Sequence, residues 1–436
     1  MAPSQSRGSR SYELYEISLR IFPGGVNSPV RAAVKPYPFF VERAEGAYIY
    51  TVDGQKLVDY VMGYGPLILG HRHPEVEAFV IEQIKKGWLY GAPHELELEL
   101  ARKILGYYMP SGMIRFVNSG TEATMTAIRL ARGVTRRRYI VKFDGCYHGA
   151  HDYVLVAAGS AAAEYGVPSS EGVPPEVAKL TFVASFNDLG SVERIMQKHG
   201  NEVAAIIVEP VVGNSGVIPP DPEFLKGLRE LADRYGALLI LDEVITGFRL
   251  GLGGAQGYYG VRGDLVTLGK IIGGGFPVGA VVGPRDIMEN LTPSGKVFNA
   301  GTFNSHPVSM AAGLATIRVL ESGTPYEVAR SAAQEVVKVI RDLIEDSGIK
   351  ATVNHVESMF TVFFTEDEVK RPEDARKADR EMYSKFQQLL LERGVFVSGS
   401  QMEAAFTSAA HTKEVVEETI EALKEVFEVL GGAAKG

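Results

Sequence analysis

The middle of the chain alternates short apolar runs with amphipathic helical patterns, and this alternation limits the possible fold more than any other feature. Each run ends in polar residues or glycine, which is typical of a buried strand that leads into a loop. The runs span residues 114–120, 139–145, 203–210 and 237–244, with helical patterns such as 121–132 and 222–236 between them. Strands that alternate with helices favour right-handed βαβ units. We therefore predict an α/β fold with a mostly parallel central sheet, and ligands at the carboxyl ends of its strands.

The pattern changes beyond about residue 325. Residues 331–348 and 413–430 predict amphipathic helices, and residues 358–365 predict a strand. Near the other end, residues 46–61 predict a β-hairpin with Asp53-Gly54 at its turn. We expect a large α/β domain flanked by two terminal segments that together form a smaller α+β domain. The expected limits are 1–62 for the N-terminal segment, 63–324 for the large domain and 325–436 for the C-terminal segment.

Charge and cysteine content exclude several classes of protein. The net charge of −8 is spread along the chain, which argues against nucleic acid or an acidic membrane surface as a main partner. The single cysteine, Cys146, cannot form an internal disulfide, and no CxxC pair suggests a zinc site. No apolar run reaches transmembrane length. The basic, Ser-rich start is short and runs into a helical pattern near Tyr12, so we predict an unprocessed cytoplasmic protein that binds no metal.

The strongest chemical signal combines Asp242 with Lys270. Asp242 ends one apolar run, and Lys270 follows another in the Gly-rich segment 267–280. A buried carboxylate at a strand end can hold a pyridinium nitrogen protonated, which keeps the ring an electron sink. A lysine just after a strand is suited to imine formation, because burial and nearby positive charge lower its pKa. A Gly-Lys pair alone is most often a surface lysine in a loop, but its combination with Asp242 indicates a pyridoxal-phosphate site.

Two further segments follow predicted strands and stay ambiguous by themselves. In 118–123, Ser119, Gly120 and Thr121 start a helix, where backbone N–H groups bind phosphate favourably, although Thr121 could also be an ordinary N-cap. In 143–149, Tyr147 could stack on a planar cofactor or lie in the core. In the same segment Cys146 fits a packed apolar residue better than a nucleophile, and His148 fits a structural hydrogen bond better than a metal ligand.

Together these segments resemble the class III aminotransferases of pyridoxal-phosphate fold type I. The resemblance rests on six motifs and runs from Gly25 to the C-terminal helix. The motifs are NSGTEA (118–123), FDGCYHG (143–149), IIVEPVVGNSG (206–216), LDEVITGFR (241–249), TLGKIIGGGFPVGA (267–280) and AGTFNSHP (300–307). More narrowly, NSPVRA (27–32), GYGPLILGHRHP (63–74), the loop 157–174 and QMEAAFTSAAHT (401–412) resemble the aminomutases of that family.

The resemblance implies a role for each matching residue. Lys270 would carry the Schiff base and act as general acid and base, and Asp242 would pair with the pyridine nitrogen. The other expected cofactor contacts are Ser119, Gly120, Thr121, Tyr147, Asn214 and Thr302. Thr302 would come from the neighbouring subunit of a homodimer. The positions expected to bind substrate are Ser28, Arg31, Ser160 and Glu403. Arginine at position 31 can hold a carboxylate by two hydrogen bonds. Residues 150–178 match a mobile loop that closes over the site.

The reaction implied is an amino exchange within one substrate. Pyridoxamine phosphate would donate its amino group to glutamate 1-semialdehyde, giving diaminovalerate and pyridoxal phosphate, and removal of the other amino group would leave 5-aminolevulinate for tetrapyrrole synthesis. Contact with glutamyl-tRNA reductase, the upstream enzyme, is also implied. The main alternative is an intermolecular ω-amino-acid aminotransferase, which needs a further arginine for a second carboxylate; Arg249 and Arg262 stay open for that role. A non-catalytic protein that binds the cofactor or a phosphosugar is a third alternative.

Two positions depart from the family pattern. Asp144 stands where glutamate is more common, and Tyr64 stands where tryptophan is common. With aspartate at position 144, the contact that the longer glutamate would make is not predicted. Tyrosine at position 64 is expected to change the wall of the pocket without changing its chemistry.

Overall fold

The central sheet follows the predicted α/β pattern. A computed structural model describes residues 9–157 and 166–434. In it seven strands line up in the order β4-β12-β11-β10-β9-β5-β8, with parallel pairing from β11 through β8 and antiparallel pairing only around β12. The strands are β4 (Met113–Val117), β5 (Tyr139–Phe143), β8 (Thr181–Ala184), β9 (Val203–Val208), β10 (Leu238–Asp242), β11 (Leu265–Gly269) and β12 (Gly279–Gly283). The prediction of a mostly parallel sheet is confirmed.

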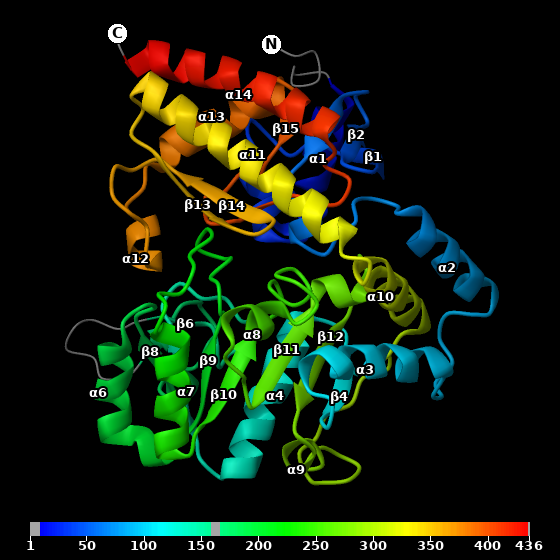
Figure 1. Ribbon diagram of the computed structural model, residues 1–436, viewed down its shortest axis with the longest axis vertical. Coiled ribbons are helices and arrows are strands. Elements are labelled where there is room, and N and C mark those ends of the chain that lie inside the picture. Colours follow the sequence, from blue (N-terminus) through cyan, green and yellow to red (C-terminus); the bar gives the residue numbers. More distant parts are fainter. Residues whose placement is uncertain (1–8, 158–165, 435–436) are drawn as a thin grey trace.

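Helices cover both faces of this sheet (Figure 1). Every residue of β9 is buried, and its alternate side chains pack in opposite directions. Ala205 and Ile207 pack with helix α4, whereas Ile206 and Val208 pack with α6 and α7. The helices of this half are α2 (Pro74–Lys85), α3 (Glu95–Tyr108), α4 (Gly120–Thr135), α6 (Leu189–His199), α7 (Phe224–Tyr235) and α10 (Pro307–Leu320). A strand buried on both faces is typical of a parallel sheet between two helical layers.

The two ends of the chain meet in a second group of elements above the sheet (Figure 1). The predicted hairpin is confirmed: β2 (Tyr48–Thr51) pairs antiparallel with β3 (Lys56–Asp59), and Gly54 takes a left-handed φ of 83° at the turn. β3 also pairs in parallel with β15 (Val395–Phe396), which joins the two terminal segments in one sheet. This pairing supports the expected domain limits, which we keep as a proposal.

The rest of this group is helical, with one small sheet. That sheet consists of β13 (Thr352–Val356), β14 (Met359–Phe363) and β16 (Ala405–Phe406), whereas β1 (Val41–Glu45) pairs with β2 in the sheet of the hairpin. The helices are α1 (Arg10–Ser18), α11 (Thr324–Ser347), α13 (Arg380–Glu392) and α14 (Lys413–Ala434). Helix α11 begins before its predicted start because Gly323 turns the chain at a φ of 79° and Pro325 suits the first helical turn. Helices α11, α13 and α14 pack on one apolar core that includes Ile340, Phe386 and Phe427.

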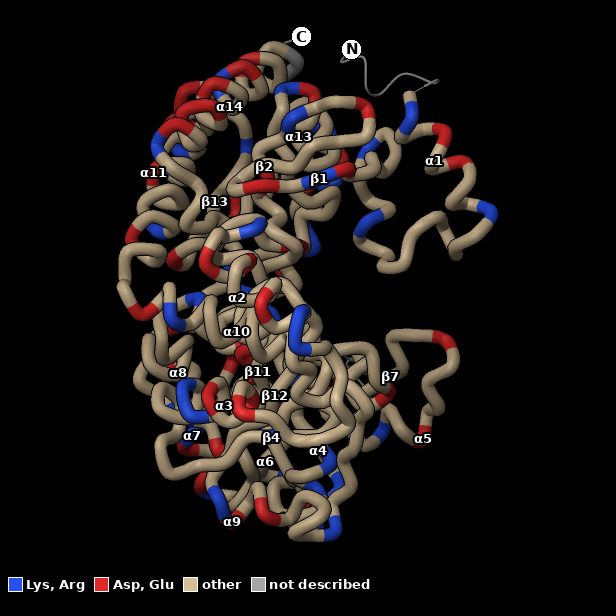
Figure 2. The backbone as a smooth tube through the Cα atoms, turned by 90° about the vertical axis from the view of Figure 1, so that its right-hand side faces the viewer, with Lys and Arg blue, Asp and Glu red and all other residues tan. Residues whose placement is uncertain are grey.

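Short elements complete the chain. They are η2 (Pro23–Gly25), η3 (Pro29–Ala33), η4 (Met62–Tyr64), β6 (Val156–Ala157), β7 (Val167–Pro168), α5 (Pro175–Ala178), η5 (Gly200–Glu202), α8 (Gly254–Tyr259), η6 (Lys270–Gly273), α9 (Arg285–Met288) and α12 (Pro372–Ala375). In Figure 2 acidic and basic residues are both spread over the tube, with acidic residues prevailing along α14, and α1 and α5 project on the same side of the molecule. In the described part of the chain, no helix has the length and apolarity needed to cross a bilayer.

Candidate active site

A cavity of about 560 Å³ opens at the carboxyl ends of the central strands. Such an edge is where parallel α/β sheets bind ligands. Eight of the predicted site residues line this cavity: Arg31, Ser119, Gly120, Thr121, Tyr147, Asn214, Asp242 and Lys270. Arg31 comes from the N-terminal segment and the other seven from the middle of the chain, so folding is what brings them together.

Asp242 ends β10 in a fixed, buried position. Its Oδ1 accepts hydrogen bonds from the Val244 N–H and the Thr267 hydroxyl, both at 3.1 Å. Its Oδ2 lies 2.7 Å from Nδ1 of His148, which is fully buried. Burial lowers the pKa of His148, so the ring is neutral at pH 7 and donates from Nδ1 to the carboxylate. The expected structural hydrogen bond of His148 therefore ends on the carboxylate that the sequence singled out.

Lys270 stands directly after β11 and faces the cavity. Its backbone takes a left-handed φ of 45°, a costly conformation for a residue with a side chain. Its Nζ donates to the Tyr64 carbonyl at 2.7 Å. Burial lowers the pKa of Lys270, while the Glu403 carboxylate nearby opposes that shift and Arg249 adds to it. An amine with a lowered pKa loses its proton more easily, as imine formation and proton transfer require.

The start of α4 forms an anion cradle on the other side of the cavity. Ser119 is the N-cap and accepts from the Glu122 N–H, so Thr121 is not the cap. A Cβ at Gly149 would lie 2.6 Å from Thr121, so this close approach requires glycine, and one at Gly120 would make a tight contact of 3.0 Å with Val244. Thr121 Oγ1 also accepts from the Ala150 N–H. The N-terminus of a long helix with hydroxyls and bare backbone favours a phosphate.

Glu209 is a site residue that sequence reasoning missed. Glu209 is 3 % exposed and directly follows β9, whose residues are all apolar. A charged residue at the end of such a strand was the signal that could have identified it. Its Oε2 accepts from the Tyr147 N–H at 2.9 Å, and its Oε1 accepts from the Asn214 side-chain amide at 2.8 Å. Burial, helped by the charge of Asp242, raises the pKa of Glu209 to about 7. Glu209 therefore fixes two of the residues expected to flank the cofactor ring.

The remaining predicted residues lie elsewhere. Ser28 caps η3 and is not among the cavity-lining residues, and Thr302 is exposed and also outside the lining. Ser160, like the part 158–165 of the expected mobile loop, lies outside the described residues. Cys146 is buried as a free thiol. Among the described residues no group of histidine, cysteine, aspartate and glutamate is arranged to hold a metal ion.

The two departures from the family pattern have separate surroundings. The Asp144 carboxylate pairs with the guanidinium of Arg376, which follows α12, so the shorter acid ties the large sheet to the C-terminal segment. Tyr64 is not among the lining residues, although its neighbours Gly63 and Pro66 are. Burial raises the pKa of Tyr64 to about 12, and its carbonyl rather than its ring contacts Lys270.

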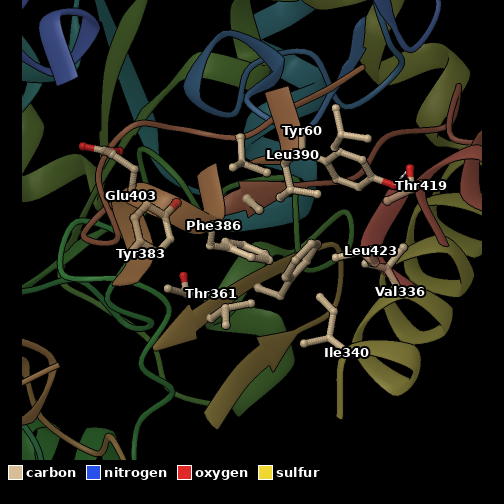
Figure 3. A pocket seen from close by; sticks show the side chains of 15 residues that line it. Tyr60, Val336, Ile340, Thr361, Tyr383, Phe386, Leu390, Glu403, Thr419 and Leu423 are labelled. Atoms are coloured by element: carbon tan, nitrogen blue, oxygen red, sulfur yellow. Dashed lines mark hydrogen bonds between the residues drawn. The ribbon is translucent and has the colours of Figure 1, made fainter. Parts of the chain in front are cut away.

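Glu403 acts on the charge of Lys270 and also borders the C-terminal core. It is one of the residues around a cavity of about 30 Å³ inside that core, and Figure 3 shows it beside Tyr383, with its carboxyl group directed away from the other labelled side chains. Burial raises the pKa of Glu403 to about 7, and the positive charge of Lys270 partly opposes this. The carboxyl group thus titrates near neutrality, close to the expected catalytic amine.

Replacement of Glu403 by glutamine should change how stability depends on pH. The raised pKa means that ionised Glu403 destabilises the folded state, fully above about pH 7 and not at all below the unfolded value of 4.5. Glutamine resembles the protonated acid, so cofactor-free E403Q should match the wild type at low pH and exceed it at high pH. One pKa unit is about 1.4 kcal/mol, so the gain in unfolding free energy reaches at most about 3 kcal/mol.

Urea unfolding of both proteins between about pH 4 and pH 8.5 measures this difference. E366Q, at an exposed residue paired with Lys350, is the matched control and should show no such gain. A constant difference between E403Q and wild type across the range would contradict the raised pKa.

The donor set of the main cavity fits pyridoxal phosphate. An anion cradle, a buried carboxylate and a lysine amine surround one cavity, and these match the phosphate, the ring nitrogen and the reactive carbon of that cofactor. Tyr147 and Asn214 lie on the same lining, where they can flank a ring. The arrangement can hold the cofactor and move protons beside it.

The fold and the cavity define a pyridoxal-phosphate protein of the aminotransferase type. The family model for aminotransferase class III matches residues 30–427, and the chain belongs to this family. Two curated relatives carry the name glutamate-1-semialdehyde 2,1-aminomutase. The protein of Hyperthermus butylicus is 69% identical over 97% of this chain and 99% of its own length, and that of Ignicoccus hospitalis is 61% identical over 97% and 99%.

Solved structures agree on the fold. An omega-transaminase from Sphaerobacter thermophilus matches with a TM-score of 0.91 and 34% identity over 98% of both chains. A glutamate-1-semialdehyde aminomutase from Pseudomonas aeruginosa matches with a TM-score of 0.87 and 26% identity over 96% of this chain and 94% of its own, and a variant of it was solved with PMP. Because both kinds of enzyme share the fold, sequence and site decide between them.

Proposed function

We propose that this chain converts glutamate 1-semialdehyde into 5-aminolevulinate, as a 2,1-aminomutase that serves tetrapyrrole synthesis. The observation that carries the proposal is the 69% identity, over nearly the whole chain, to a protein of that name. The cavity supports it, because Lys270, Asp242 and the anion cradle converge there. The fold alone would also suit a transaminase.

The residues of the chain divide the work in the proposed reaction. The bound cofactor would supply the electron sink and, in its pyridoxamine form, the amino group. The carboxylate of Asp242, held by His148 and Thr267, keeps a proton on the ring nitrogen. The Nζ of Lys270 takes a proton from one carbon and returns it to another in each half of the exchange. The helix start at Ser119 and Thr121 binds the phosphate, while Tyr147 and Asn214 orient the ring.

The substrate carboxylate is assigned to Arg31. Arg31 is exposed and lines the cavity, where a planar guanidinium can hold a carboxylate by two hydrogen bonds. We further assign Ser28, Ser160 and Glu403 to the substrate, and Glu403 is supported by its electrostatic contact with Lys270. These roles rest on the match of the motifs.

The alternative, an intermolecular ω-amino-acid aminotransferase, is less favoured. That reaction needs a further arginine at the cavity for a second carboxylate. Arg249 is 1 % exposed and is not among the lining residues, and its two Nη groups are bonded to Gly65 and Ser358. Arg262 is exposed and is likewise absent from the lining. Neither of the two arginines that the sequence suggested is therefore placed to bind the carboxylate of a second substrate.

Absorbance and product analysis test the proposal. Purified protein loaded with pyridoxamine phosphate should convert added glutamate 1-semialdehyde to 5-aminolevulinate without any second amino donor or acceptor. Separate feeding of an ω-amino acid with 2-oxoglutarate should give no robust glutamate formation. Efficient glutamate formation without semialdehyde conversion would favour the alternative and reject the aminomutase.

We also propose a homodimer with shared active sites in the cytoplasm. Thr302 is exposed in its own subunit and lies next to the exposed Phe303, which suits a residue that contacts a partner's phosphate. Contact with glutamyl-tRNA reductase would deliver the unstable semialdehyde, and it stays part of this proposal. No nucleic acid or membrane partner is proposed.

A further inference from the structure

Arg249 is a buried cation without a carboxylate partner in its described contacts. Its Nη1 donates to the Ser358 hydroxyl at 2.9 Å, its Nη2 donates to the Gly65 carbonyl, and its guanidinium lies 4.6 Å from the ring centre of Phe406. Its Nε has no hydrogen-bond partner among the described residues. A charge buried in this way is costly, and stability alone would favour an apolar side chain.

The carbonyl that Arg249 contacts belongs to an unusual turn. Four successive residues, Met62 to Gly65, have left-handed φ values of 48°, 65°, 65° and 119°. Two of them carry side chains, and such conformations persist only when their surroundings enforce them. Asp59 enforces this one, because its Oδ1 accepts from the Val61 and Met62 N–H groups at 2.8 and 3.0 Å.

The turn presents two neighbouring carbonyls to two cations. The Tyr64 carbonyl accepts from Lys270 Nζ, and the Gly65 carbonyl accepts from Arg249. A Cβ at Gly65 would lie 3.4 Å from the Lys270 side chain and 3.4 Å from the Phe406 ring, so the fit around the lysine stem is close. Arg249 thus binds the same turn as the amine, although it is not among the residues that line the cavity.

We propose that the carbonyls of Tyr64 and Gly65, with the buried guanidinium of Arg249 bound to the second of them, form a dock that holds the free Lys270 amine beside the cavity. The inference rests on the proposed function, in which the amine must be freed and reused in both halves. Arg249 is a positioning residue, since it contacts neither cavity nor substrate. Three acids face Lys270 and favour its charged form: Glu403, Asp242 and Glu209. Arg249 opposes all three.

The test measures the amine in cofactor-free protein, without substrate. Trace acetic anhydride labels each lysine in proportion to its uncharged fraction, and mass spectrometry of peptides gives a labelling midpoint for Lys270 between about pH 6 and pH 11. Lys142 is the internal control: it is also buried, its Nζ donates to Val154 and Val156, and Arg249 is not among the charges that shift it.

In R249M the Lys270 midpoint should move to higher pH, with severalfold less labelling at pH 8, while Lys142 stays unchanged. R249K keeps the charge and should restore most of the wild-type midpoint. An unchanged Lys270 midpoint in R249M would overturn the proposal. Raised labelling of Lys142 would show that R249M is unfolded. In that case a substitution in the turn itself provides the test.

G65A disturbs the carbonyls and leaves Arg249 in place. Loss of the Tyr64 acceptor removes a contact that favours the ammonium, so the Lys270 midpoint should move to lower pH, opposite to R249M. G54A is the matched control, because Gly54 also has a left-handed φ and a Cβ there would meet nothing within 4 Å. Equal midpoints in G65A and G54A would reject the dock. Semialdehyde conversion is measured separately, so shifted midpoints in an inactive protein would sink only the proposed function.

Discussion

Replacement of Lys270 by alanine should lower semialdehyde conversion by roughly 10³-fold or more, because general acid–base transfer alone contributes up to about 10⁴-fold. Among the described residues that line the cavity, the only lysine, histidine or cysteine besides Lys270 is His148, whose Nδ1 is engaged by Asp242. The proton at the reacting carbons would then have no carrier. Single-turnover conversion with a fixed amount of loaded cofactor is the measurement.

Controls separate loss of chemistry from loss of cofactor. The helix start at Ser119 and the Asp242 carboxylate do not depend on Lys270, so K270A should still bind pyridoxamine phosphate and show its absorbance. Small primary amines in the buffer should restore part of the rate. K226A, at an exposed lysine on α7, should behave as wild type. Normal turnover in K270A would defeat the assignment outright.

The parts of the site that sequence reasoning found share one physical cause. Asp242 is the last residue of one buried strand, Lys270 directly follows another, and the carboxyl ends of neighbouring parallel strands meet at one edge. The same reasoning placed Ser119 and Thr121 at a helix start. Local pattern and chain direction were therefore enough to predict this half of the cavity.

The rest depends on contacts that local pattern does not encode. His148 and Asp242 are 94 positions apart and meet because β9 alone separates β5 from β10, an order that periodicity does not determine. Lys270 reaches a carbonyl 206 positions away only because of the left-handed turn at Met62–Gly65. The sequence motif there suggested a ring at position 64 in the pocket wall, whereas the backbone makes the contact. A pattern of side chains cannot show which backbone carbonyl will accept a hydrogen bond.

Substitution of Asp242 by asparagine should slow both halves of the exchange by roughly 10²–10³-fold, the range found when a charge-stabilising group is removed from an active site. Asparagine keeps the size and the Thr267 contact but cannot hold a proton on the ring nitrogen by charge. Because the amide oxygen keeps the contacts of Oδ1, the amide nitrogen faces the buried Nδ1–H of His148, and the ring must change its tautomer to accept from it.

The two halves can be followed separately by the absorbance of the bound cofactor, before and after addition of semialdehyde or of diaminovalerate. D264N is the matched control, since Asp264, just before β11, also accepts from a backbone group, the Leu239 N–H of β10, and pairs with Arg229, but is not among the residues that line the cavity. It should lose stability without a change in the spectrum or in either rate. In D242N the spectrum and both rates should change together, because one carboxylate serves the same nitrogen in both halves. Rates within severalfold of wild type would mean that the electron sink works without this charge, and the role of Asp242 would then be structural.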